Sequence, residues 1–292
     1  MDARIPPDQI SVAIGGVGGS GTRLIADMLM RCEYYIGGSL NRAHDNLWFT
    51  LLFKRPGWFK QLPSEKEIAS TINLFVRAMT TGLSENTSES ETNYIWKIAR
   101  ELEDVGFRTG VDRTTAKQLV NSRSANFNYY AGWGWKEPNT HIFLPQIAAT
   151  IPTMKYVHVI RNGLDMAAGN NQQQLHNWGK FIGVPAENSM SLASRSLEFW
   201  IAANRRAIDI CERQFHERYH IINYDEFCKN PYEGVERFAE FLGVTMPDKK
   251  MEALAQLVSP KTIGRRRRHT TGMFSETQVE AVREFGFVID EY

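Results

Sequence analysis

The stretch ISVAIGGVGGSGTRLIADML, residues Ile10 to Leu29, decides the fold. It starts with apolar side chains at alternate positions (Ile10, Val12, Ile14), as in a β-strand, and continues with five glycines in the seven positions 15–21. Apolar residues with helical spacing follow directly. The stretch therefore predicts a strand, a loop almost free of side chains and the N-terminus of a helix. Converging backbone N–H groups beside the positive end of a helix suit a phosphate or sulfate, whereas the alternative is a glycine-rich tight turn without a ligand.

Two well-known phosphate-binding loops resemble this stretch, but each requires a residue that is missing here. Residues 16–21 satisfy G-x-G-x-x-G, yet a dinucleotide site also needs an acidic residue about twenty positions on, where residues 35–39 read YIGGS. The Walker A loop needs Lys followed by Ser or Thr, whereas Thr22 here precedes Arg23, which disfavours a magnesium-dependent NTPase. The loop is therefore expected to hold its anion with Ser20, Thr22, backbone N–H groups and Arg23, without a metal.

Bulk composition narrows the classes of protein to consider. The 292 residues suffice for one large α/β domain, so residues 1–292 are expected to form a single domain. The 34 Lys and Arg residues nearly balance 33 Asp and Glu residues, which gives no support to general nucleic-acid binding. The three cysteines lack metal-ligand spacing, so no metal site is expected. The polar N-terminus and the lack of a long apolar run predict a cytoplasmic protein that does not engage a membrane.

The rest of the chain alternates predicted strands and helices. Residues 155–160 form the clearest strand, and a long amphipathic helix is predicted from Met190 to Phe215. Residues from roughly 60 to 130 are predicted to form a helical insertion, with a Ser/Glu/Asn-rich mobile loop from Gly82 to Thr92. The alternation predicts a parallel sheet flanked by helices, and therefore an α/β fold.

Two polar residues fall within these apolar patterns. His158 alternates with valines in the predicted strand, so we expect it to lie on a face of the sheet rather than to act in catalysis. Asn204 falls inside the apolar stripe of the long helix. A buried amide needs hydrogen-bond partners, so Asn204 is expected to have one.

A candidate acceptor pocket follows the second predicted strand. His44 and Asp45 directly precede the apolar run Leu47-Trp48-Phe49, and polar groups at the edge of an aromatic wall are typical of a ligand pocket. Trp58 and Phe59 would add to the same wall. The alternative is that Asp45 serves only as the N-cap of the helix that follows.

Charged residues also follow two of the predicted strands. Lys136 and Glu137 end a short strand, and Arg161 ends the strand over residues 155–160. Ligands bind at the carboxyl ends of strands in an α/β sheet, and a guanidinium there can bind a phosphate with two hydrogen bonds. The alternative for Lys136 and Glu137 is a structural ion pair.

Four consecutive arginines lie near the end of the chain, in the segment GRRRRH over residues 264–269. Such a run could be a nuclear signal or a nucleic-acid patch. Because acidic residues balance the charge elsewhere, a local site that binds an anion is the preferred interpretation, with Arg265, Arg266 and Arg267 as its main members.

Together these residues resemble the sulfotransferase family that uses 3′-phosphoadenosine 5′-phosphosulfate (PAPS). Residues 18–22 resemble its 5′-phosphosulfate loop, P-K/R-S/T-G-S/T, and residues 161–165 resemble the start of its 3′-phosphate motif, R-N/D-P-x-D. Residues 224–243, with YDEF, NP and FLG, are similar to the family's "YEDL…P…FLG" stretch, and residues 264–267 to its "GRWR". The four blocks occur in the family's order.

The resemblance implies a P-loop NTPase-like sulfotransferase fold and a set of donor-binding residues. PAPS would be the sulfuryl donor, and 3′-phosphoadenosine 5′-phosphate (PAP) the product. The implied contacts are Gly18, Gly19, Ser20, Gly21, Thr22, Arg23, Arg161, Gly169, Asn170, Tyr224, Arg265, Arg266 and Arg267. Two positions depart from the family. Gly19 replaces a basic residue, so Arg23 or Lys136 would supply the charge, and Gly169 replaces a Ser, so Asn170 or the arginine run would supply that contact.

The resemblance also implies an in-line, metal-independent transfer of a sulfuryl group to a hydroxyl or, less favourably, an amine. Asp45 is the first candidate for the general base, with Glu137 and His44 behind it, and Lys136 could stabilise the leaving group. The acceptor would be a small molecule or a carbohydrate, and the residues carry no signal for an oligomeric state. The alternatives are a magnesium-dependent nucleotide kinase or NTPase, and a non-enzymatic module that binds nucleotides or nucleic acid.

Overall fold

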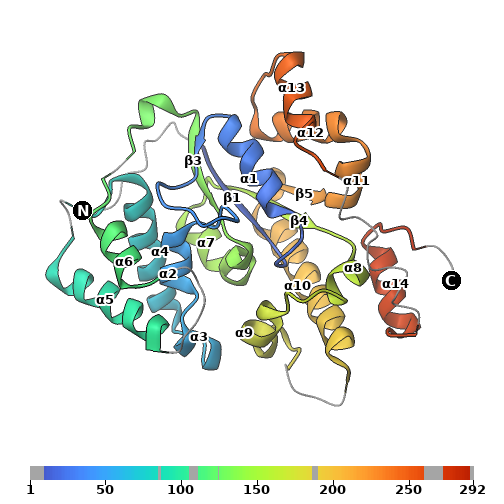
Figure 1. The fold of residues 1–292 in the computed structure, drawn as a ribbon, viewed down its shortest axis with the longest axis horizontal. Coiled ribbons are helices and arrows are strands. Elements are labelled where there is room, and N and C mark those ends of the chain that lie inside the picture. Colours follow the sequence, from blue (N-terminus) through green and yellow to red (C-terminus); the bar gives the residue numbers. More distant parts are fainter. Residues whose placement is uncertain are drawn as a thin grey trace.

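The computed structural model describes residues 10–84, 87–104, 111–123, 125–185, 190–259 and 272–289. In these ranges the chain forms a parallel sheet with the strand order β2-β3-β1-β4-β5 and helices on both faces (Figure 1). The predicted α/β fold with a flanked parallel sheet is confirmed. The strands are β1 (Ile10–Gly16), β2 (Tyr34–Tyr35), β3 (Gly132–Lys136), β4 (Lys155–Ile160) and β5 (Tyr219–Asn223).

The register of the sheet brings the predicted site residues to one edge. β1 lies between β3 and β4, with Ile14 beside Lys136 and Gly16 beside Val159. Ile160 in turn lies beside Asn223 at the end of β5. All these strands run in the same direction, so the loops that follow their carboxyl ends lie at a common edge of the sheet.

Two apolar cores cover the two faces, as the strand period of two requires. Val12 and Ile14 of β1 and Val157 and Val159 of β4 pack on one face. The helices on that face are α1 (Thr22–Arg31), α11 (Tyr224–Lys229) and α12 (Pro231–Leu242), and α13 (Asp248–Ala255) packs beside α12. Figure 1 shows α1, α12 and α13 on this side of the sheet.

The opposite face carries the larger core. Trp133, Trp135 and Tyr156 point from β3 and β4 into it, together with Ala13 of β1. The helices that contribute to this core include α2 (Leu47–Phe53), α4 (Glu65–Thr80), α7 (Leu144–Thr150), α9 (Gln173–Ile182), α10 (Leu192–Gln214) and α14 (Glu276–Glu284). Smaller helices are α3 (Pro56–Lys60), α6 (Arg113–Val120) and α8 (Gly163–Ala167), with 3-10 turns η1 (Phe127–Tyr129), η2 (Pro138–Phe143) and η3 (His216–Arg218).

Helices α2 to α6 lie in the sequence between β2 and β3, which are neighbours in the sheet. Within this region α5 (Glu89–Asp104) starts earlier than the predicted loop from Gly82 to Thr92 allows. The reason is a reciprocal cap: the Ser88 hydroxyl accepts from the Glu91 N–H at 3.2 Å, and the Glu91 carboxylate accepts from the Ser88 N–H at 3.0 Å. None of the helices in the described ranges has both the length and the apolar character needed to cross a bilayer.

Candidate active site

The glycine-rich loop joins β1 to α1 in a conformation that needs its glycines. Gly19 and Gly21 have φ angles of 101° and 103°, in the left-handed region that side chains disfavour. A Cβ on Gly16 would lie 2.5 Å from the Val159 carbonyl oxygen, and one on Gly21 would overlap the Tyr224 ring. The glycines therefore allow the loop to turn sharply while it packs against β4 and the start of α11.

The loop presents hydrogen-bond donors that no described group satisfies. The Ser20 N–H donates to the Val17 carbonyl at 3.0 Å, but within the described ranges the N–H groups of Gly19, Gly21, Thr22 and Arg23 have no acceptor. The Ser20 side chain is buried, and its hydroxyl has no hydrogen-bond partner among the described residues either. Helix α1 starts here without a side-chain cap. Uncompensated donors at a helix N-terminus can bind an anion, which is the role that the sequence predicts for this loop.

Arg161 and Tyr224 come together beside this loop. The Tyr224 ring packs against Gly21, and the guanidinium carbon of Arg161 lies 5.6 Å from the centre of that ring. The turns that carry them are joined, because the Asn162 N–H donates to the Asp225 carboxylate at 2.9 Å. Three of the predicted donor-binding segments, from the ends of β1, β4 and β5, therefore meet at one place.

Asp45 and Lys136 form an ion pair at the end of β3. The Lys136 ammonium contacts one carboxylate oxygen of Asp45 and donates to the Ala43 carbonyl at 3.0 Å. The other Asp45 oxygen accepts from the Asn41 side-chain amide at 2.8 Å. The Asp45 side chain is 15% exposed and that of Lys136 is 3% exposed. The carboxylate is thus held in one orientation while part of it stays accessible.

The alternative assignment of Asp45 as a helix cap is wrong. The N-cap of α2 is Asn46, whose side-chain oxygen accepts from the Phe49 N–H at 2.9 Å. Asp and Asn have similar capping preferences, so local sequence could not choose between adjacent residues. The contact with Lys136, far away in sequence, is what occupies Asp45 instead.

Glu137 does not pair with its neighbour Lys136, and each of the two forms an ion pair with another residue. Glu137 is fully buried, and its carboxylate lies 3.3 Å from the Lys54 ammonium. The same carboxylate caps η2 by accepting from the Asn139 N–H at 2.6 Å. Successive residues of a strand point to opposite faces, which sends Lys136 and Glu137 to different partners.

His44 lies next to Asp45 but is directed at α1. Its φ angle of 62° is unusual for a residue with a side chain, and its Nδ1 atom lies 3.5 Å from the Asp27 carboxylate. The His44 side chain is 27% exposed. His44 is therefore next to Asp45 in the sequence, but its side chain faces a different carboxylate, that of Asp27.

Gly169 and Asn170 lie at the end of α8, beside a hollow of about 460 Å³. The hollow is also lined by Ala167, Ala168, Leu192, Ala193 and Met273. Gly169 is tied locally, since its carbonyl accepts from the Gln172 side chain at 2.7 Å. The remaining predicted donor contacts, Arg265, Arg266 and Arg267, lie outside the described residues.

The aromatic wall predicted beside Asp45 belongs to the core. Trp48, Phe49 and Trp58 are buried at 4% exposure or less, and Phe49 stacks on Phe53 with ring centres 4.3 Å apart. The prediction of these residues as lining for an acceptor pocket is therefore wrong. Helix α2 is buried on all sides, which a run of seven residues with only one polar side chain could have indicated.

His158 and Asn204 form a buried network below the loop. The His158 ring accepts or donates a hydrogen bond with the Tyr156 hydroxyl at 2.9 Å and with the Asn204 side-chain oxygen at 2.8 Å. A Cβ on Gly15 would lie 2.5 Å from that tyrosine hydroxyl. Burial lowers the pKa of His158 to about 4, although the Asn204 hydrogen bond opposes the shift. His158 thus packs inside the sheet as predicted, and Asn204 has the partner it was expected to need.

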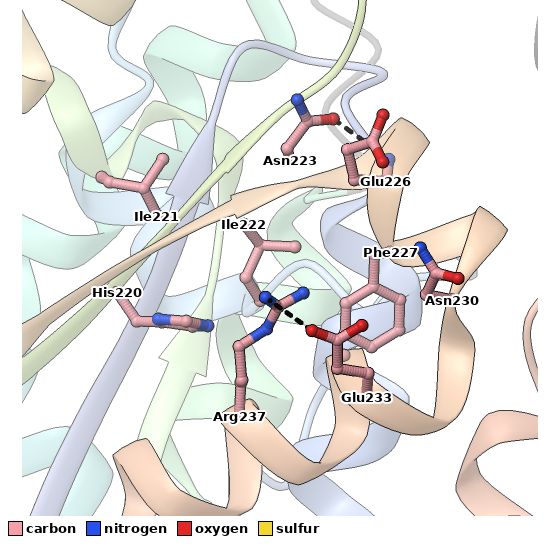
Figure 2. A pocket seen from close by; sticks show the side chains of 10 residues that line it. His220, Ile221, Ile222, Asn223, Glu226, Phe227, Asn230, Glu233 and Arg237 are labelled. Atoms are coloured by element: carbon pink, nitrogen blue, oxygen red, sulfur yellow. Dashed lines mark hydrogen bonds and ion pairs between the residues drawn. The ribbon is translucent and has the colours of Figure 1, made fainter. Parts of the chain in front are cut away.

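Another hollow, of about 470 Å³, lies away from the loop at the β5 edge of the sheet, and Figure 2 shows its lining from β5, α11 and α12. The guanidinium of Arg237 lies 3.2 Å from the Glu233 carboxylate, and burial with the nearby charge of Arg237 lowers the pKa of His220 to about 4. None of the residues that line this hollow was predicted as a site residue.

Sequence reasoning missed Gln174 of α9. It is buried, and its side-chain oxygen accepts from the loop's Gly18 N–H at 2.9 Å. The available signal was the position of Gln174 beside Leu175 and one helical turn before Trp178, on the apolar face of a short helix. A glutamine on such a face needs a partner, but the sequence does not say which.

Comparisons with known proteins bear on the family and the fold. The model of the sulfotransferase family matches residues 11–248. The sulfotransferase domain of an olefin synthase from Synechococcus PCC 7002 has a similar structure, with a TM-score of 0.54, 14% identity, and coverage of 99% of this chain and 98% of that one. A sulfotransferase domain from the curacin biosynthetic pathway has a TM-score of 0.52 and 13% identity, over 99% of this chain and 100% of that one. No curated protein matches the sequence.

Proposed function

The chain belongs to the sulfotransferase family, and on that premise we propose that it transfers a sulfuryl group from PAPS to a hydroxyl group of a small-molecule or carbohydrate acceptor. An amine is the less favoured acceptor. The observation that carries the proposal is the loop at the start of α1. Among the described residues its N–H groups at Gly19, Gly21, Thr22 and Arg23 and its buried Ser20 hydroxyl have no partner, which suits an anion. Arg161 lies beside this loop, where its guanidinium would bind the second phosphate of the sulfuryl donor PAPS.

In this proposal the donor is bound by three segments. The N–H groups of the loop, Ser20 and Thr22 hold the 5′-phosphosulfate, with Arg23 in place of the usual basic residue at Gly19. Arg161 holds the 3′-phosphate, with Gly169, Asn170 and the arginines at 265–267 as its neighbours. Tyr224 offers a ring face between the two. The contact of the Tyr224 ring with Gly21 and Arg161 supports this arrangement.

Asp45 is the general base that we propose. Asn41 and Lys136 orient its carboxylate, which would take the proton from the acceptor hydroxyl as the acceptor oxygen bonds to sulfur. The bond from sulfur to the 5′-phosphate oxygen breaks in line, and the loop donors stabilise the charge that PAP gains. Asp45 is preferred over Glu137, which is fully buried, and over His44, which faces Asp27.

Calorimetry with PAP, ATP and NAD, each with and without magnesium, tests the donor. We expect metal-independent binding of PAP to be the tightest, because ATP and NAD lack a phosphate for Arg161 at the 3′ position. A preference for ATP that depends on magnesium would overturn the proposal in favour of a kinase or NTPase. A screen of hydroxyl and amine acceptors with labelled donor then tests the acceptor class.

A further inference from the structure

The glycine loop has an internal support whose role the proposed reaction does not assign. The Gly18 N–H donates to the Gln174 side-chain oxygen at 2.9 Å, and the nitrogen of the same amide lies 3.5 Å from the Gly16 carbonyl oxygen. Gln174 is 8% exposed. One side chain from α9 therefore bridges two backbone groups on either side of Val17, where the strand ends and the loop starts.

Gln174 is itself held by a chain of buried hydrogen bonds. Its nitrogen donates to the Asn139 side-chain oxygen at 3.1 Å, which also accepts from the Trp178 indole at 2.9 Å. The Asn139 nitrogen donates to both carboxylate oxygens of Glu137 at 3.0 Å. Lys54 balances that carboxylate at 3.3 Å. The chain thus connects α2, η2, α9 and the loop.

A continuous series of hydrogen bonds leads from the loop to Glu137. The Gly18 N–H donates to the Gln174 side chain, which donates to the Asn139 side chain, which donates to the Glu137 carboxylate. Turning either amide over would place N–H groups against N–H groups, so the network allows one orientation for each side chain. The negative charge of Glu137 at the end of the chain strengthens the hydrogen bonds that lead to it.

The loop needs such support because its own backbone groups disfavour its conformation. Several of its N–H groups have no acceptor in the described part of the chain, so they repel one another where they lie close, and Gly19 and Gly21 hold left-handed backbone angles. A bridge between Gly16 and Gly18 limits the backbone conformations open to the loop. The loop then loses less conformational entropy when the anion binds, and the affinity of the loop for the anion is higher.

We propose that Gln174, oriented by Asn139 and Glu137, is a positioning residue that holds the loop in its anion-binding conformation. This inference rests on the proposed function, because PAP is the anion used to test it. Glu137 in this assignment acts through Asn139 and Gln174 and does not itself touch the acceptor.

Gln174→Glu is the decisive variant, and Gln173→Glu is its control. The first places a carboxylate oxygen against the Gly16 carbonyl and the Asn139 oxygen, both of which are acceptors. The second adds the same charge on the preceding, exposed residue of α9. We expect Gln174→Glu to weaken PAP binding by at least about tenfold and Gln173→Glu by less than about threefold, measured well below the unfolding temperature.

Hydrogen exchange and turnover complete the test. The Gly18 N–H should exchange slowly in the unliganded protein and faster in Gln174→Ala. The KM for the donor should rise more than kcat falls, because the loop contacts the donor before and during transfer. Unchanged PAP affinity and unchanged Gly18 exchange in both Gln174 variants, with only a lower unfolding temperature, would overturn the inference. Failure of the unsubstituted protein to bind PAP would instead refute the proposed donor.

Discussion

Two carboxylates flank the end of β3, and they have opposite environments. The open side, made of Asn41, Asp45 and Lys136, leaves the Asp45 side chain 15% exposed. The closed side, made of Glu137, Asn139 and Gln174, leaves the Glu137 side chain 1% exposed, with hydrogen bonds to both oxygens. The difference is one of access: the Asp45 carboxylate is held by its partners but partly exposed, whereas the Glu137 carboxylate is enclosed by its partners.

The largest effect is expected on the open side. Asp45→Asn keeps the shape of the side chain but removes the base, so turnover should fall by about 10²–10⁴-fold while PAP affinity is retained. Steady-state kinetics with labelled donor and calorimetry with PAP measure the two quantities. Asp27→Asn is the matched control, because it removes an equal charge from a nearby, exposed carboxylate. Unchanged turnover in Asp45→Asn would assign the base elsewhere.

A comparable change on the closed side should lower the stability of the protein. Glu137→Ala leaves the Lys54 charge and the Asn139 amide without their buried partner. Breaking a buried pair in this way costs about 3–5 kcal/mol, which urea denaturation would measure as a lower midpoint. Preserved stability together with a large loss of turnover would contradict the comparison and favour Glu137 as the base.

Acid should weaken the buried network below the loop. The pKa of His158 is lowered to about 4 by burial, from 6.5 in its ordinary state. The unfolded chain therefore binds a proton at a higher pH than the folded one, and the stability present above pH 6.5 is lost as the pH falls toward 4. The loss from His158 is up to about 3 kcal/mol. Unfolding midpoints measured in steps across this window check the prediction, and His158→Gln should flatten the slope.

The smallest effect is expected at His44. It lies on the open side of the strand end but pairs with Asp27, and its φ of 62° suits asparagine better than histidine. His44→Asn should change stability by no more than about 0.5 kcal/mol and turnover by less than about threefold. A loss of turnover as large as that of Asp45→Asn would make His44 the proton acceptor.

Local patterns predicted the fold because each strand and helix carries its own signal. Alternating apolar residues before the glycines, and helical spacing after them, identify β1, the loop and α1. The start of α5 was placed too late because the cap between Ser88 and Glu91 lies inside a polar stretch typical of a loop. Polar composition outweighed the capping signal in that prediction.

The partners of the site residues could not be predicted in the same way. Arg161 was predicted from its place at the end of a strand and Tyr224 through a family resemblance, and the register of the sheet brings them together. Gln174 lies far from Gly18 in the sequence, and Asp45 lies far from Lys136. Such contacts depend on how the elements pack, which spacing along the chain does not encode. The long-range contacts are therefore where the structure adds most to the sequence.

The position of the helices from α2 to α6 has a consequence for how such a protein can diverge. They leave the sheet after β2 and return to it at β3, which is the adjacent strand. Lengthening, shortening or replacing the part of this excursion that follows Lys54 would leave the order of the strands in the sheet unchanged. Evolution could therefore change the helices on one side of the molecule, and with them the acceptor, while the glycine-rich loop after β1 stays the same.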